Sequence, residues 1–83
     1  MNVIIYGKPN CPNCEKTKML CQIQSIEYSH LQLGVDYEVE QLNELVGSEV
    51  RSLPQIFIQD ERKTRYIGDY NALRSALTEL ATA

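Results

Sequence analysis

The sequence YGKPNCPNC at residues 6–14 decides the fold, because it spans the end of a strand, a loop and the start of a helix. Residues 2–6 are rich in β-branched side chains, which predicts a short buried strand. Gly7 and Pro9, which interrupt regular secondary structure, then predict a loop at 7–10. Pro12 suits the first turn of a helix over 12–24, since the N–H that proline lacks would have no partner there. The stretch therefore predicts a strand–loop–helix unit with a Cys-x-x-Cys motif at the helix N-terminus.

Residue periodicity and turn signals place the other elements along the chain. They predict a strand at 27–33, a helix from an N-cap at Asp36 to a stop at Gly47, strands at 55–59 and 63–67, and a last helix capped by Asp69 or Asn71. The order β-α-β-α-β-β-α combines a parallel unit with an antiparallel hairpin. It predicts an α/β fold in which helices cover both faces of a four-stranded mixed sheet. A length of 83 residues predicts a single domain, 1–83.

Composition excludes several classes of function. Eleven acidic residues outnumber eight Lys and Arg, and no basic tract occurs, so nucleic acid is not an expected partner. No apolar run reaches the roughly 20 residues of a spanning helix, so no membrane association is expected. No signal peptide is expected at the N-terminus. A disulfide scaffold would have more cysteines and an even number of them, whereas this chain has three. That count favours a reducing, cytoplasmic location.

The spacing of Cys11 and Cys14 indicates redox chemistry. At a helix N-terminus, unpaired N–H groups and the helix dipole would favour the Cys11 thiolate, and such surroundings lower a cysteine pKa from about 8.5 to between about 3.5 and 7.5. Lys8 could add a positive charge. Cys14 follows one turn later on the same face. Cys11 could therefore attack a substrate disulfide, and Cys14 could resolve the mixed disulfide that results.

A zinc site is the alternative interpretation of the cysteines. Cys11, Cys14, Cys21 and His30 would supply a Cys₃His set. On a continuous helix, however, Cys21 would lie about 10 Å along the axis from Cys14, which zinc–sulfur bonds of about 2.3 Å do not span. We therefore favour the redox interpretation. Cys21 is then predicted to be a core residue, and His30 is interpreted as a strand residue rather than a catalytic base.

Three motifs resemble those of the glutaredoxins, a family with the thioredoxin fold. They are residues 6–14, the sequence SLPQIFI at 52–58 and the sequence IGDYN at 67–71. The resemblance implies a thioredoxin-like fold and a dithiol glutaredoxin activity. Such an enzyme would reduce protein disulfides and glutathione mixed disulfides, with glutathione as its reductant and no metal.

The same resemblance implies a glutathione-binding groove beside the first cysteine. Its expected residues are Lys8, Asn13, Arg51, Leu53, Pro54, Gly68, Asp69, Tyr70 and Asn71. The two basic side chains would meet the glycine carboxylate. The Leu53 backbone, beside a cis Pro54, would pair with the cysteinyl residue. Tyr70 and Asn71, at a helix N-terminus, would hold the γ-glutamyl carboxylate.

Three residues depart from the family pattern. Asn13 stands where an aromatic residue is common, Asp69 replaces the second glycine of the third motif, and Asn71 lacks the charge of an aspartate found in relatives. These positions concern the expected glutathione groove rather than the dithiol.

Two other functions remain open by analogy with relatives. One is a glutathione-dependent [2Fe–2S] cluster-binding protein, and the other is a redoxin that thioredoxin reductase reduces. Ribonucleotide reductase is a candidate electron acceptor on the same analogy. A monomer is expected.

Overall fold

The computed structural model describes residues 1–61 and 63–82, and the side chains of residues 80–82 fall outside that description. The elements are β1 (Asn2–Gly7), α1 (Pro12–Ile23), β2 (Glu27–Gln32), α2 (Val39–Val46), β3 (Gln55–Gln59), β4 (Thr64–Gly68) and α3 (Tyr70–Thr82). The predicted order β-α-β-α-β-β-α is confirmed.

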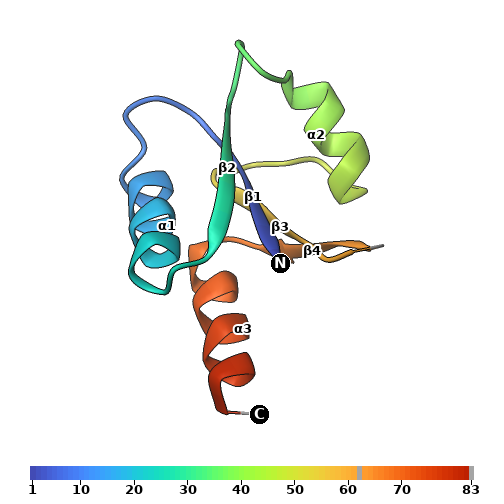
Figure 1. The fold of residues 1–83 in the computed structure, drawn as a ribbon. Coiled ribbons are helices and arrows are strands. Elements are labelled where there is room, and N and C mark those ends of the chain that lie inside the picture. The colour runs from blue at the N-terminus through green and yellow to red at the C-terminus, as the bar shows by residue number, and fades with distance from the viewer. Residues whose placement is uncertain (62, 83) are drawn as a thin grey trace.

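The strands form a mixed sheet in the order β2-β1-β3-β4. β1 runs parallel to β2 and antiparallel to β3, and β4 pairs antiparallel with β3. Figure 1 shows α1 and α3 on one side of the sheet and α2 on the other. The predicted four-stranded mixed sheet with helices on both faces is therefore confirmed. In the described part of the chain, no helix combines the length and apolarity needed to cross a membrane.

β1 lies inside the sheet and contributes to two cores. Val3 and Ile5 pack with Cys21 in the cluster beneath α1 and α3. Ile4 and Tyr6 alternate to the opposite face, where they join the cluster beneath α2. Cys21 has no exposed surface, and burial raises the pKa of its thiol. The prediction of a core role for Cys21 is confirmed, and its environment disfavours the reactive thiolate.

The predicted N-cap of the second helix is wrong. Asp36 lies in the turn after β2, where its carboxylate accepts a hydrogen bond from the Gln32 N–H at 2.8 Å. The N-cap is Glu38, whose own N–H donates to the Gln41 side chain at 2.8 Å in a capping box. The carboxylate of Asp36 is thus engaged in closing the turn, and the helix begins later.

The remaining boundaries agree with the predictions to within a few residues. Asp69, and not Asn71, caps α3, because its carboxylate accepts a hydrogen bond from the Ala72 N–H at 2.9 Å. Gly47 ends α2 in the left-handed conformation, at φ 87°. Such a C-cap favours glycine, which has no Cβ to clash there.

Tyr37 connects the segment before α2 to the end of β1. Its side chain is buried, at 6% exposure, and its hydroxyl donates to the Gly7 carbonyl at 2.9 Å. The same carbonyl also accepts the Leu33 N–H. The ring packs edge-on against Tyr6, with centroids 5.0 Å apart. Burial, and then the neighbouring Tyr6, raises the pKa of Tyr37 to about 12.

Replacing Tyr37 with Phe should lower the free energy of unfolding by about 0.5–1.5 kcal/mol, because one hydrogen bond to Gly7 is lost. The folded pKa of about 12 exceeds the ordinary value of 10.0, so the contribution of this hydroxyl is complete below pH 10 and declines as pH rises toward 12. Urea unfolding at neutral and alkaline pH measures both effects. Tyr28→Phe, which removes a surface hydroxyl bonded to Gln22, is the control; equal losses in the two variants would contradict the prediction.

Candidate redox-active site

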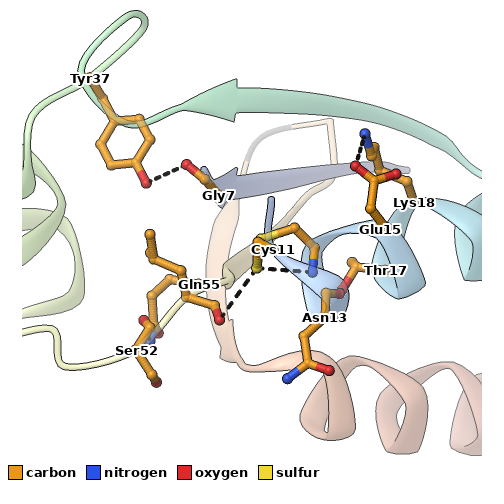
Figure 2. Close-up of a disulfide and its surroundings, with 11 residues drawn as sticks. Gly7, Cys11, Asn13, Glu15, Thr17, Lys18, Tyr37, Ser52 and Gln55 are labelled. Carbon is orange, nitrogen blue, oxygen red and sulfur yellow. Dashed lines mark hydrogen bonds and ion pairs between the residues drawn. A yellow bond between two sulfur atoms is a disulfide. The ribbon is translucent and has the colours of Figure 1, made fainter. Parts of the chain in front are cut away.

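The cysteine pair lies where α1 begins, as predicted. Cys11 is the N-cap, with extended backbone angles of φ −114° and ψ 106°, and Pro12 occupies the first turn. Cys11 and Cys14 form a disulfide whose Cα atoms are 5.2 Å apart. Figure 2 shows Cys11 between the end of β1 and the segment that precedes β3.

The two sulfur atoms have different surroundings. The Cys14 backbone N–H donates to Cys11 Sγ at 3.3 Å, and the Leu53 carbonyl oxygen lies 3.9 Å from the same sulfur. Cys11 retains 6% exposure, whereas Cys14 has none. In the reduced chain, the N–H and the positive end of α1 would stabilise negative charge on Cys11. The geometry can therefore support a thiolate at the surface with a second thiol behind it.

Gly7 allows β1 to pack against this pair. A Cβ at Gly7 would lie 2.8 Å from Cys14 Sγ and 2.7 Å from His30 Nε2, closer than side-chain contacts permit. From the sequence, Gly7 was interpreted only as a residue that interrupts regular secondary structure. The one feature of the sequence that indicates its packing role is its position at the end of a buried strand, four residues before Cys11.

A buried glutamine, Gln55, connects the segment before β3 to β4. The Leu53–Pro54 peptide bond is cis, as the family resemblance implied. Gln55 lies next to it, and its amide donates to the Ser52 carbonyl at 2.8 Å while its side-chain oxygen accepts from the Tyr66 hydroxyl. Figure 2 shows Gln55 and Ser52 near Cys11. The one signal for Gln55 in the sequence is a polar residue at the start of an apolar strand.

The expected groove residues divide between two cavities. Lys8, Arg51 and Leu53 line a cavity of about 200 Å³ that α2 borders. Tyr70 and Asn71 line a different cavity, between α1 and α3. The structure thus brings the two basic side chains together near Leu53 and places the start of α3 apart from them.

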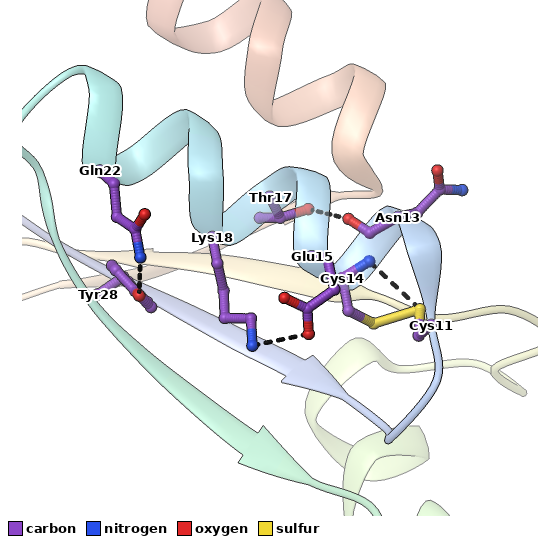
Figure 3. Close-up of polar contacts among 8 residues, drawn as sticks. All are labelled: Cys11, Asn13, Cys14, Glu15, Thr17, Lys18, Gln22 and Tyr28. Carbon is purple, nitrogen blue, oxygen red and sulfur yellow. Dashed lines mark hydrogen bonds and ion pairs between the residues drawn. A yellow bond between two sulfur atoms is a disulfide. The ribbon is translucent and has the colours of Figure 1, made fainter.

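The other expected groove residues have local structural roles. Asn13 is exposed and its carbonyl accepts the Thr17 hydroxyl at 2.7 Å; Figure 3 shows its side chain directed away from the cysteines. Gly68 has φ 125°, and a Cβ there would lie 3.1 Å from Ala72 Cβ. Asp69 uses its carboxylate to cap α3 and has a negative φ, so it replaces glycine without the left-handed backbone.

The zinc interpretation gains no support from the arrangement of side chains. Cys21 packs into the core with Val3 and Ile5 rather than beside the cysteine pair. Within residues 1–61 and 63–82, no group of three or more His, Cys, Asp or Glu residues is placed to hold a metal ion.

These features define the class of protein. A cysteine pair opens a helix on a mixed sheet of this order, and a cis-proline segment lies against the first sulfur. That combination of fold and site is characteristic of thiol–disulfide oxidoreductases with the thioredoxin fold.

Comparison with known proteins identifies the family. The glutaredoxin family model matches residues 3–63. A glutaredoxin from Haemophilus influenzae is 33% identical over 79 residues, which cover 88% of this chain and 90% of that protein. Reduced Escherichia coli glutaredoxin superposes with a TM-score of 0.80, at 25% identity and full coverage of both chains. Glutaredoxin 1 from Francisella tularensis has the same fold, with a TM-score of 0.74, 21% identity, and 99% and 98% coverage. The chain belongs to the glutaredoxin family.

Replacing Gly7 with Ala should destabilise the fold by about 1–3 kcal/mol, because the added methyl group overpacks the space against Cys14 and His30. Chemical denaturation of the oxidised and reduced chain measures the loss. In a Cys14→Ala background the same substitution should cost less, since the closest sulfur is gone. An equal cost in both backgrounds would show that Gly7 and Cys14 do not compete for this space.

Proposed function

We propose that the chain is a glutathione-linked oxidoreductase that reduces protein disulfides and glutathione mixed disulfides through Cys11 and Cys14. Membership of the glutaredoxin family and the position of the disulfide support the proposal. The observation that carries it is the contact of the Cys14 N–H with Cys11 Sγ at the start of α1. We further propose a cytoplasmic monomer, with ribonucleotide reductase as one candidate protein acceptor.

The proposed reaction has two displacements at sulfur. The Cys11 thiolate attacks a substrate disulfide, forms a mixed disulfide and releases one substrate thiolate. The Cys14 thiol then loses its proton and attacks Cys11 Sγ, which closes the Cys11–Cys14 disulfide and releases the second thiolate. Two glutathione molecules restore the dithiol and leave as glutathione disulfide. The 6% exposure of Cys11 and the complete burial of Cys14 favour this division of roles.

The proposed contact for glutathione is the cavity that Lys8, Arg51 and Leu53 line. Glutathione is an anion, and two exposed cations beside the Leu53 backbone offer it charge and hydrogen bonds. Tyr70 and Asn71 lie at the N-terminus of α3, which favours a carboxylate. Tyr70 and Asn71 line a cavity separate from that of Lys8 and Arg51. We therefore propose that one end of the glutathione molecule contacts each cavity.

Replacing each cysteine in turn tests the proposed roles. Cys11→Ser should abolish disulfide exchange with glutathione, because the attacking sulfur is lost. Cys14→Ser should keep measurable deglutathionylation, which needs a single thiol, and should reduce protein-disulfide reduction strongly. Coupled glutathione assays on both substrate types provide the measurement. Cys21→Ala, which alters a buried thiol outside the disulfide, is the control and should retain both activities. Full activity in Cys11→Ser would refute the mechanism.

Neutralising the basic cavity should weaken substrate binding. Lys8→Gln or Arg51→Gln is expected to raise KM for a glutathione mixed disulfide by about two- to fivefold, the effect of an exposed charge pair, with little change in kcat. Added salt should reduce the difference. Lys63→Gln is the matched control, because Lys63 lies near Met1 at the opposite end of the sheet. An unchanged KM in both Lys8 and Arg51 variants, or an equal change in the control, would contradict this assignment.

A further inference from the structure

His30 has an unusual environment for a strand residue. Its Nε2 atom is buried and has no hydrogen-bond partner among the residues that the structure describes. Buried polar atoms in folded proteins nearly always have a partner, so an isolated one requires an explanation. His30 lies on β2 opposite Ile5 of β1, on the face that α1 covers. It is the chain's single histidine.

The unpaired nitrogen and the sulfur of the buried Cys14 both lie next to Gly7. The Cβ position of Gly7 lies 2.7 Å from His30 Nε2 and 2.8 Å from Cys14 Sγ, so both atoms border the same small space. Because Gly7 has no side chain, nothing from its own residue separates imidazole from sulfur. The disulfide sulfur of Cys14 has no proton to donate. In the reduced chain it becomes a thiol, which can donate to a neutral imidazole nitrogen.

The charges around His30 favour the neutral imidazole. Burial is the largest cause that lowers its pKa, and Lys18 of α1 adds to it. Glu15 of α1 and Asp36 of the turn after β2 act in the opposite direction, and Glu15 is paired with Lys18 at 2.8 Å. A His pKa below its usual 6.5 leaves the ring uncharged and able to accept a proton at neutral pH.

We propose that His30 acts as the general base for the resolving cysteine, accepting the Cys14 proton at Nε2 as Cys14 attacks the mixed disulfide. This inference rests on the proposed function. In the step, the Cys14 S–H bond breaks and its proton moves to Nε2, while a sulfur–sulfur bond forms between Cys14 and Cys11. The bond from Cys11 to the substrate sulfur breaks, and the substrate leaves as a thiolate. The imidazolium then returns its proton to that thiolate or to water.

A two-phase thiol assay separates this role from the action of Cys11. The reduced chain is mixed with excess 5,5′-dithiobis(2-nitrobenzoate), so that attack by Cys11 releases one coloured thiolate and attack by Cys14 releases the second. Stopped-flow absorbance resolves the bimolecular first phase from the intramolecular second phase. His30→Gln keeps a polar side chain that cannot accept the proton. It should slow the second phase by at least about tenfold near neutral pH, since general bases contribute about 10²–10⁴-fold, and leave the first phase unchanged.

The pH profile and a matched variant make the result specific. The difference between His30→Gln and wild type should shrink at alkaline pH, where Cys14 ionises without help. Gln32→Ala alters the same face of β2 one step further along and should leave both phases unchanged. Equal second phases in wild type and His30→Gln at every pH would overturn the inference, and so would equal slowing of both phases. Absence of the first phase would instead refute the proposed function.

A measurement without any His30 variant keeps the inference testable. The Nε2 resonance of the single histidine can be compared in the reduced wild-type chain and in reduced Cys14→Ala by ¹⁵N NMR. A hydrogen bond from the Cys14 thiol should shift that resonance in the wild type alone. Identical Nε2 resonances in the two reduced chains would overturn the inference.

Discussion

The close contact between the end of β1 and the first turn of α1 is the constraint on which the site depends. Gly7 leaves no side chain in the space that Cys14 Sγ and His30 Nε2 border. Its carbonyl meanwhile accepts the Tyr37 hydroxyl and the Leu33 N–H. One residue thus joins the sheet, the helix that carries the cysteines and the segment leading to α2. Side-chain packing and backbone hydrogen bonding therefore both constrain the position of Gly7.

Cys11 and Cys14 have identical side chains, but their surroundings differ. Cys11 sits at the N-cap, where backbone N–H groups and the helix dipole favour negative charge. Cys14 lies one turn inside, fully buried against β1 and beside an imidazole with a lowered pKa. A stabilised thiolate that retains some accessible surface suits attack on an external disulfide, whereas a fully buried thiol is protected from external reagents. The position of the motif at a helix start therefore gives the two cysteines different surroundings, although their side chains are identical.

Much of this architecture follows from local patterns in the chain. The apolar run of β3 and the proline at the start of α1 were readable because local propensity and tertiary structure agree there. Asp36 misled because a carboxylate before a helix is a good N-cap in general, yet here the turn after β2 engages it. The bonds of Gln55 with Tyr66 and of Tyr37 with Gly7 could not be predicted, because they join residues 11 and 30 positions apart and leave no trace in local periodicity.

By itself, the sequence determined the element order, the cysteine pair at a helix N-terminus, the core position of Cys21 and the resemblance to glutaredoxins. These features rest on neighbours within a few residues, where spacing decides which side chains share a face. Only the tertiary structure decided that Lys8 and Arg51 share a cavity while Asn71 lines another. It also decided that His30 and Cys14 both lie next to Gly7. The parallel pairing of β2 with β1 sets His30 opposite Ile5, on the face of the sheet that α1 covers. Such contacts join residues distant in the chain, and their chemistry exists only once the sheet has formed.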